Sequence, residues 1–187
     1  GYSLNYRDIV VENSYAFIAR NGGIDVIDVL DPKNLRFVYT LSVTGENFNN
    51  VQLRDGYLYA STVSGKFYIW RMIDTKNYQS FSAIDIGSEF KFYFKDEYLL
   101  IVKENIGLNI YNLNDALATS TPTIVGSFNF SEIKDIGFTD NKLYVLKGKN
   151  LQLYSIVWPS NSVVATTTLI KDYQFIPEET QFISKRL

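Results

Sequence analysis

The chain has 187 residues, a formal net charge of −2, and neither cysteine nor histidine. The missing residue types exclude disulfides, thiolate chemistry and serine–histidine or cysteine–histidine catalysis within this chain, because those mechanisms need a thiol or an imidazole. The charge gives no basic surface for nucleic acid, so we expect no nucleic-acid binding. No apolar run approaches the about 20 residues that span a bilayer, so we expect no membrane span in this segment. We also expect no cofactor and no enzymatic activity.

A phrase of two strand patterns joined by an acidic turn recurs five times along the chain. The copies cover residues 8–19, 50–61, 91–102, 135–146 and, more weakly, 173–184. The residue two past the turn acid advances by 42, 41 and 44 positions from Tyr15 through Tyr57 and Tyr98 to Lys142. A period of roughly 40 to 45 residues is typical of one four-stranded propeller blade.

A third strand pattern follows each complete phrase. It occupies residues 23–29, 66–72, 107–113 and 150–156. Neighbouring positions such as Val26 and Ile27 are both apolar, and neighbours on a strand point to opposite faces of the sheet. We therefore predict that this strand is buried on both faces, as in a sheet stacked between two others.

A fourth strand closes each unit, and its more polar alternation predicts an outer, edge-like position. The expected ranges are 36–41, 79–84, 123–128 and 163–169. Asp55-Gly56 and Asp140-Asn141 predict two-residue hairpin turns, whose central positions require a positive φ that these residues tolerate. No window has sustained helical periodicity; the best candidate, 112–118, is short and falls where a loop is expected.

These repeats predict an all-β fold, a β-propeller of four-stranded antiparallel blades with four complete blades and the start of a fifth. The expected units of this single domain are residues 6–48, 49–89, 90–131, 132–171 and a partial 172–187. Because propellers usually hold roughly four to eight blades, we expect the segment to belong to a larger propeller. The alternative is completion by partner chains, which would pair with its open end strands.

Polar residues open the first strand of each unit, and that strand lies nearest the axis of a propeller. These residues are Asp8, Asn50, Lys91 and Asp135. We predict that they ring one mouth of the central channel and are the candidate ligand-binding residues. The alternative is that they only solvate and brace the channel.

Two aromatic columns run through the first phrase. They are Tyr15, Tyr57 and Tyr98, and Phe17, Tyr59, Leu100 and Tyr144. At strand spacing we predict that they form the core between blades rather than a sugar-stacking face.

Three carboxylates cluster at Asp25, Asp28 and Asp31. On a strand Asp25 and Asp28 point to opposite faces, so we predict a solvated strand end and a turn cap rather than a calcium site, and no metal site elsewhere. Asn129 opens the tripeptide Asn-Phe-Ser, an N-glycosylation sequon that matters if the protein is secreted.

The segment Gly23–Pro32, followed by Phe37-Val38, resembles the LVIVD repeat, a blade motif of surface or secreted propeller proteins. Residues 107–113 leading to 122–126 are similar with a longer connection, whereas the second and fourth units lack the Asp-Pro step. The resemblance implies a propeller fold and an extracellular or cell-surface location. It supplies no catalytic residue.

We therefore predict a non-enzymatic β-propeller interaction or scaffold module, with proteins or copies of itself as partners. One alternative is a propeller that binds glycans or small ligands at the channel mouth. Others are a self-assembling structural subunit completed by strand sharing between chains, and an enzyme whose active site is completed by further blades.

Overall fold

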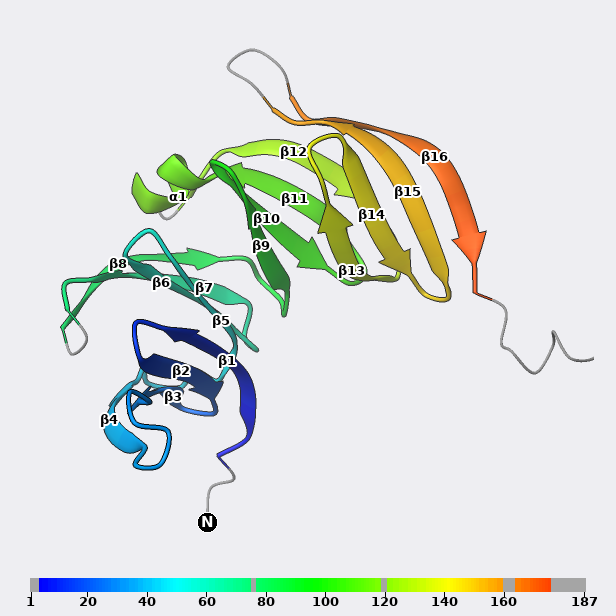
Figure 1. Cartoon of the computed structure of the whole chain (residues 1–187). Helices are drawn as coiled ribbons and strands as arrows, with labels where there is room; N and C mark the ends of the chain where they lie inside the picture. The colour runs from blue at the N-terminus through cyan, green and yellow to red at the C-terminus, as the bar shows by residue number, and fades with distance from the viewer. Residues whose placement is uncertain (1–3, 75–76, 119–120, 160–163, 176–187) are drawn as a thin grey trace, which may run out of the picture. The chain divides into compact units, whose positions relative to one another are not determined.

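The fold consists of four antiparallel sheets, as predicted. The structure is a computed structural model that describes residues 4–74, 77–118, 121–159 and 164–175. These residues form sixteen strands and one short helix, and each sheet contains four strands in sequential order (Figure 1). The fourth strand lies at the edge of every sheet, which confirms the predicted outer position.

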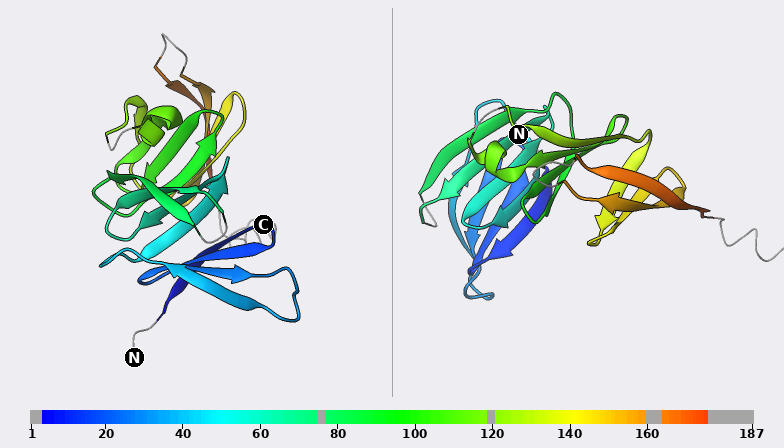
Figure 2. Two further views of the ribbon diagram at one scale, coloured as in Figure 1. Left: turned by 90° about the vertical axis from the view of Figure 1, so that its left-hand side faces the viewer. Right: turned by 90° about the horizontal axis from the view of Figure 1, so that it is seen from above.

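The sheets follow one another along the chain and are twisted, as the further views in Figure 2 show. The first sheet contains β1 (Tyr6–Glu12), β2 (Tyr15–Arg20), β3 (Gly23–Asp28) and β4 (Arg36–Leu41). The second contains β5 (Phe48–Arg54), β6 (Tyr57–Thr62), β7 (Lys66–Met72) and β8 (Tyr78–Asp85). The third contains β9 (Lys91–Lys95), β10 (Tyr98–Lys103), β11 (Gly107–Asn112) and β12 (Ile124–Asn129). The fourth contains β13 (Ile133–Phe138), β14 (Lys142–Lys147), β15 (Asn150–Val157) and β16 (Thr166–Gln174).

Backbone contacts divide the chain into two compact units. The first comprises residues 1–99 and 112–123, and therefore contains the first two sheets and β9. The second comprises residues 100–111 and 124–187, and contains β12 and the fourth sheet.

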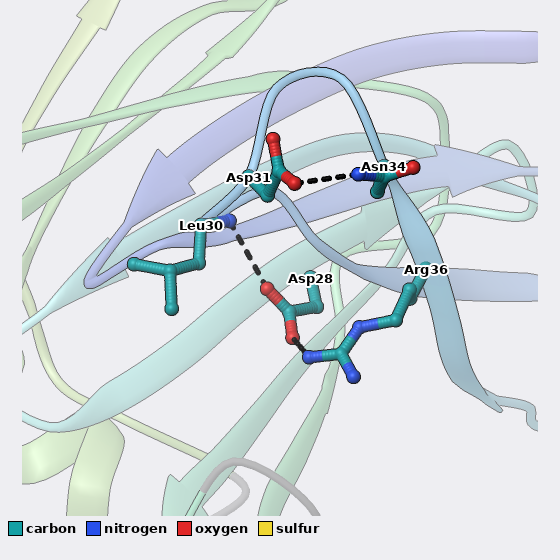
Figure 3. A pocket seen from close by; sticks show the side chains of 5 residues that line it. All are labelled: Asp28, Leu30, Asp31, Asn34 and Arg36. Carbon is teal, nitrogen blue, oxygen red and sulfur yellow. Dashed lines mark hydrogen bonds and ion pairs between the residues drawn. The ribbon is translucent and has the colours of Figure 1, made fainter.

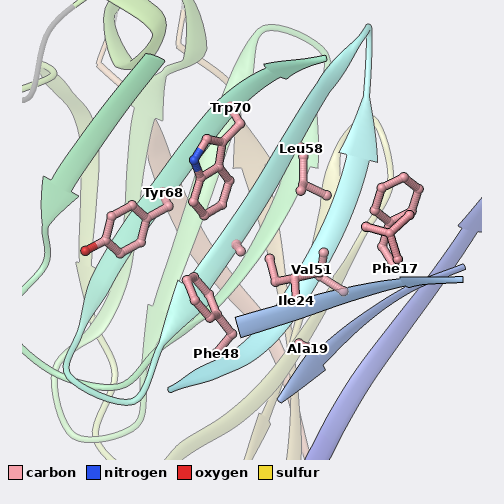
Figure 4. Packing of buried hydrophobic residues seen from close by; sticks show 10 residues of the cluster. Phe17, Ala19, Ile24, Phe48, Val51, Leu58, Tyr68 and Trp70 are labelled. Atoms are coloured by element: carbon pink, nitrogen blue, oxygen red, sulfur yellow. The ribbon is translucent and has the colours of Figure 1, made fainter. Parts of the chain in front are cut away.

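A buried cluster joins the first sheet to the second within the first unit (Figure 4). It comprises Phe17, Ala19, Ile24 and Val26 from the first sheet and Phe48, Val51, Leu58, Ala60, Tyr68 and Trp70 from the second. On the other face of the second sheet, Phe67 lies with its ring centroid 4.9 Å from that of Phe92 in β9. The strand β7 is thus buried on both faces, as its apolar columns predict.

The pairing of third and fourth strands is interrupted by a bulge at the same place in all four sheets. The register shifts fall between Val26 and Ile27, Ile69 and Trp70, Ile110 and Tyr111, and Leu153 and Tyr154. A bulge adds one residue to one strand and increases the local twist. The repeat is therefore present in the backbone as well as in the side chains, although no residue type marks the bulge.

Two local predictions need correction. Asp55 and Gly56 have φ values of 52° and 77°, as the hairpin turn requires, but Asp140 and Asn141 are not among the positive-φ residues. The second hairpin is instead closed by the Thr139 amide, which donates to the Lys142 carbonyl at 2.9 Å.

The second correction is a helix, α1 (Leu113–Ala118), where the sequence predicts a loop. Its start is capped by the side chain of Asn112, whose Oδ1 accepts hydrogen bonds from the amides of Asn114 at 2.9 Å and Asp115 at 3.3 Å. This helix is short, and none of the described helices is long and apolar enough to cross a bilayer.

The strand β16 extends further than predicted. Tyr173 pairs with Leu151 and Gln174 with Asn150, so the first two residues of the expected fifth phrase belong to the fourth sheet. No glycine or proline interrupts the strand pattern between Thr166 and Phe175, which explains the continuation. The rest of that phrase, from residue 176, lies outside the described residues.

Candidate functional site

The predicted channel-mouth residues follow a recurring irregularity of the first strands. The pairing of first and second strands shifts register between Tyr6 and Asp8, Phe48 and Asn50, and Ile133 and Asp135. Bulges redirect side chains and are frequent beside binding sites. The repeat thus gives Asp8, Asn50 and Asp135 the same local backbone setting.

Asp8 and Asn50 come together on neighbouring first strands. Oδ2 of Asp8 accepts a hydrogen bond from the amide of Val51 at 2.9 Å, and Nδ2 of Asn50 lies 3.5 Å from the same oxygen. The other carboxylate oxygen accepts from the Ile9 amide at 2.9 Å. The Asp8 carboxylate therefore links β1 to β5. These contacts fit the predicted bracing role as well as the predicted binding role.

The other two predicted residues, Lys91 and Asp135, belong to different sheets and differ in exposure. Lys91 begins β9 in the first unit and is exposed. Asp135 lies in β13 of the second unit, half-buried, and its Oδ1 accepts from the Ile136 amide at 2.8 Å. Asp135 thus repeats the local contact of Asp8 with the following amide.

A pocket of about 310 Å³ lies at the connection between β3 and β4 (Figure 3). It is lined by Asp28, Leu30, Asp31, Asn34 and Arg36. Oδ2 of Asp28 lies 2.5 Å from Arg36, and Oδ2 of Asp31 accepts from Asn34 at 2.6 Å. The polar groups of the pocket are thus paired with one another, while the Leu30 side chain is exposed.

Hydrogen bonds keep both pocket carboxylates ionised. The amide of Leu30 and the guanidinium of Arg36 lower the pKa of Asp28. The side chain of Asn34 and the amide of Lys33 lower the pKa of Asp31. Neither carboxylate is therefore suited to act as a proton donor near neutral pH.

The third carboxylate of the predicted cluster, Asp25, belongs to a separate network. Its Oδ2 accepts from Arg20 Nε at 2.7 Å and its Oδ1 from the Thr40 hydroxyl at 2.5 Å. Burial raises the pKa of Asp25, but the hydrogen bonds from Arg20 and Thr40 outweigh it and lower the pKa overall. Among the residues that the structure describes, no group of three or more His, Cys, Asp or Glu side chains could hold a metal ion.

A second buried carboxylate was not predicted. Glu46 accepts from Lys66 Nζ at 2.8 Å and from the Ser64 hydroxyl at 2.6 Å. Burial raises its pKa, but these hydrogen bonds prevail and lower it. Glu46 lies in the loop before β5, and no equivalent residue recurs in the other units, so the repeat gives no signal for it.

The aromatic columns are mostly core, as predicted. Phe17, Tyr59 and Leu100 are buried, and the ring of Tyr59 lies 4.6 Å from that of Phe94. Tyr144, the fourth member of the column, is exposed. The difference distinguishes the fourth sheet from the first three.

Comparison with solved structures identifies the architecture. The chain matches a Bacteroides uniformis protein named as a candidate 6-phosphogluconolactonase with a TM-score of 0.70 and 14% identity, over 92% of this chain and 55% of that chain. It matches the computationally designed Ika4 protein with a TM-score of 0.58 and 11% identity, over 91% of this chain and 94% of that chain. It also matches the complex of KlAtg21 with the coiled coil of AgAtg16 with a TM-score of 0.59 and 19% identity, over 92% of this chain and 58% of that chain.

These similarities show a β-propeller-like fold with four blades, each blade being one of the sheets described above. The chain spans 50 to 58% of the length of the matched natural propellers. No protein-family model matches the chain, and no curated protein sequence matches it.

Proposed function

We propose that this chain is a non-enzymatic β-propeller interaction module of a cell-surface or extracellular protein. Its partner contact is the exposed connection between β3 and β4, and its blades are of the LVIVD type. The observation that carries the proposal is the contrast on this connection: its carboxylates are held in pairs, whereas Leu30, Leu35 and Phe37 are exposed to solvent.

Exposed apolar side chains beside charged ones are typical of protein-binding surfaces. Leu30 lines the pocket with the Asp28–Arg36 pair, and Leu35 and Phe37 flank Arg36 in the sequence. This combination supplies an apolar contact with polar groups around it. A protein surface with an apolar anchor is the partner that fits it.

Two further observations agree with a binding role. One of the matched propellers was solved in complex with a coiled coil, so this architecture accommodates a protein partner in that case. Three of the carboxylates with a lowered pKa, Asp25, Asp28 and Glu46, each accept a hydrogen bond from a basic side chain. Such groups stabilise the blades rather than move protons.

Site-specific photo-crosslinking tests the proposed contact. A photoreactive amino acid replaces Leu35 in the full chain, expressed in cells that naturally produce it, and Ile73 serves as a matched exposed position in the turn after β7. We expect a crosslinked protein at position 35 that is absent at position 73 and is lost on Leu30→Glu. Equal crosslinking at both positions overturns the assignment of the contact.

An activity assay tests the non-enzymatic part. One matched propeller carries the name of a lactonase, so hydrolysis of 6-phosphogluconolactone is the substrate assay to run on this chain. We expect a rate equal to that of buffer alone. Hydrolysis that scales with protein concentration contradicts the proposal.

Glycan binding at the channel mouth is the second candidate, favoured by the meeting of Asp8 and Asn50 on neighbouring strands. Binding to a glycan array that is lost on Lys91→Ala or Asp135→Ala would support it over the protein-binding role.

The N-glycosylation predicted for the secreted protein is tested at Asn129. This residue is exposed at the end of β12, where a glycosyltransferase can reach it. Secretion from a glycosylating host should therefore give a product whose mass falls on treatment with an N-glycosidase, and Asn129→Gln should abolish that change.

A further inference from the structure

We propose that Asn21 is a site of spontaneous chemical modification, at which the backbone nitrogen of Gly22 attacks the Asn21 side chain, and that the loop of residues 42–47 sets the rate. Asn21 is the one asparagine of this sequence that a glycine follows. The inference goes beyond the proposed interaction module and does not depend on it. It is carried by contacts around the turn between β2 and β3, all of them within the first unit.

The reaction is a ring closure between two neighbouring residues. The Gly22 nitrogen forms a bond to Cγ of Asn21 and gives up its proton, the bond from Cγ to Nδ2 breaks, and ammonia leaves. Water then opens the resulting succinimide at either of its two carbonyl carbons, so the product is aspartate or isoaspartate. Glycine favours the closure, because it has no Cβ beside the attacking nitrogen and its backbone is permissive. Asparagine is accordingly one of the thermolabile residue types of proteins.

Hydrogen bonds hold the attacking nitrogen back. The Gly22 amide donates to the carbonyl oxygen of Glu46 at 3.1 Å and to Oδ1 of Asn47 at 3.2 Å. Asn21 and Asn47 also form an isolated β-bridge. An amide nitrogen attacks only after it has lost its proton, and a hydrogen-bonded amide releases its proton when its contact opens locally. The reaction therefore waits for the turn to leave the loop.

The loop that supplies these acceptors is attached to the second sheet. The Val63 amide donates to the carbonyl oxygen of Asn47 at 2.9 Å. The carboxylate of Glu46 accepts from Lys66 Nζ at 2.8 Å. Gly22 belongs to the turn between two strands of the first sheet, whereas both of its acceptors are fixed to the second. The rate of modification therefore depends on a contact between these two sheets.

Arg7 lies where it assists the bond-forming step. The register shift between Tyr6 and Asp8 makes Arg7 the extra residue of a bulge. Its Nη2 donates to Oδ1 of Asn21 at 3.1 Å. Negative charge develops on this oxygen when the Gly22 nitrogen adds to Cγ, and a donor aimed at a developing oxyanion lowers the barrier. Arg7 thus promotes the step that the hydrogen bonds of Gly22 delay.

The two products differ in their effect on the turn. Isoaspartate at position 21 lengthens the backbone by one methylene group, which displaces Gly22 from its two acceptors. Aspartate keeps the backbone path and places a carboxylate beside Arg7. Isoaspartate therefore opens the contact between the turn and the loop, whereas aspartate preserves it.

Peptide mapping by mass spectrometry tests the proposal on the full chain. The folded protein is kept at mildly alkaline pH below its melting temperature, cleaved at lysines at intervals, and compared with the chain unfolded in guanidinium chloride. The peptide that ends at Lys33 contains Asn21. We expect both products in the folded chain, formed about tenfold more slowly than in the unfolded chain, because the reaction waits for local opening. Equal rates, or an Asn21 that stays intact in the folded chain while the unfolded chain converts, overturn the proposal.

Variants of Asn47 separate the contact with Gly22 from overall stability. Asn47→Ala removes one acceptor and should raise the rate in the folded chain about fivefold, which corresponds to the loss of a hydrogen bond of about 1 kcal/mol. Asn47→Asp keeps an oxygen at the same position and should react near the wild-type rate. Val145→Ala is the matched control, because Val145 is buried in β14 of the second unit and its substitution lowers stability without touching this contact. A wild-type rate in Asn47→Ala, or an equal rise in Val145→Ala, contradicts the role of the loop.

The role of Arg7 is tested in the same assay. Arg7→Met should slow the reaction several-fold in the folded chain and leave it unchanged in guanidinium chloride, since the contact with Asn21 exists only in the fold. Arg36→Met removes an exposed arginine of the same sheet that pairs with Asp28, and should leave both rates unchanged. A faster reaction in Arg7→Met would show that Arg7 restrains the Asn21 side chain instead of promoting its attack. Circular dichroism and thermal melting establish that each variant is folded at the temperature used.

Discussion

At the scale of single residues, two carboxylates of the first sheet pair with different arginines. Asp25 pairs with Arg20, and their side chains are 10% and 15% exposed. Asp28 pairs with Arg36, whose side chain is 73% exposed. Because water screens the second pair and not the first, equal substitutions of the two arginines should have unequal effects.

We expect Arg20→Met to lower the free energy of unfolding by about 3 kcal/mol near neutral pH, because it leaves the Asp25 charge buried without its cation. Arg36→Met should lower it by less than about 1 kcal/mol. Urea unfolding followed by tryptophan fluorescence measures both. Equal losses would show that the Arg20–Asp25 pair is no better shielded than the surface pair.

The same pair should give a pH dependence with a defined sign. The pKa of Asp25 is lowered in the folded chain, so its contribution is present above the unfolded pKa and is lost as the pH falls through the folded value. The difference in stability between wild type and Arg20→Met should therefore shrink as the pH falls below about 4, the ordinary range of an aspartate. A difference that stays constant down to acid pH would contradict this assignment.

Two buried tyrosines differ from Asp25 in their hydrogen bonding. The hydroxyls of Tyr39 and Tyr78 are buried without a hydrogen-bond partner among the described residues, and burial raises the pKa of Tyr78. The Tyr68 hydroxyl, in contrast, donates to Glu46 at 3.4 Å.

Tyr78→Phe should be neutral or stabilise the fold by up to about 1 kcal/mol, because it removes an unsatisfied polar group. Tyr68→Phe should cost about 1 kcal/mol, because it removes a hydrogen bond to a charged group. Chemical denaturation of both variants at neutral pH compares them. A clear loss in Tyr78→Phe would mean that its hydroxyl is satisfied in solution.

At the scale of the element, the close approach of β11 to β12 in the third sheet depends on a glycine at the start of β11. Gly107 has φ of 129°, and a Cβ built there would lie 2.0 Å from the Phe128 carbonyl oxygen. Only glycine combines that backbone conformation with that contact.

Gly107→Ala should therefore destabilise the protein by about 2 kcal/mol or more, through backbone strain and the displaced β12. Gly137→Ala is the control, since its nearest contact is the Tyr144 Cβ at 4.0 Å and its φ is not positive. Thermal melts of the two variants should differ clearly. Similar melting temperatures would show that β12 can move aside at little cost.

Element positions follow closely from the sequence where periodicity is strong. Adjacent apolar positions in the third strands predict burial on both faces because alternation on a strand is strict. The strand β7 is buried on both faces, whereas in β3 Val26 is buried and Ile27 is half-buried. The helix α1 escapes prediction because six residues carry too little periodicity, and its cap at Asn112 is a local contact. The end of β16 is missed because the alternation of the outer strand continues into what resembles a new phrase.

The candidate site is less predictable than the strands. Asp8 and Asn50 meet because the repeat places them at equivalent positions of neighbouring strands. The pairing of Glu46 with Ser64 and Lys66 depends on how a loop folds back on a turn, which no periodic pattern encodes. Sequence repetition thus predicts contacts that recur in each unit and misses those made once.

At the scale of the whole molecule, the four blades are not equally protected. The strands β6 and β10 are buried along nearly their whole length, whereas β16 is exposed along nearly all of it. Backbone amides exchange slowly where opening must break a packed core and quickly at exposed edges. Hydrogen exchange should therefore be slowest in β6 and β10 and fastest in β16.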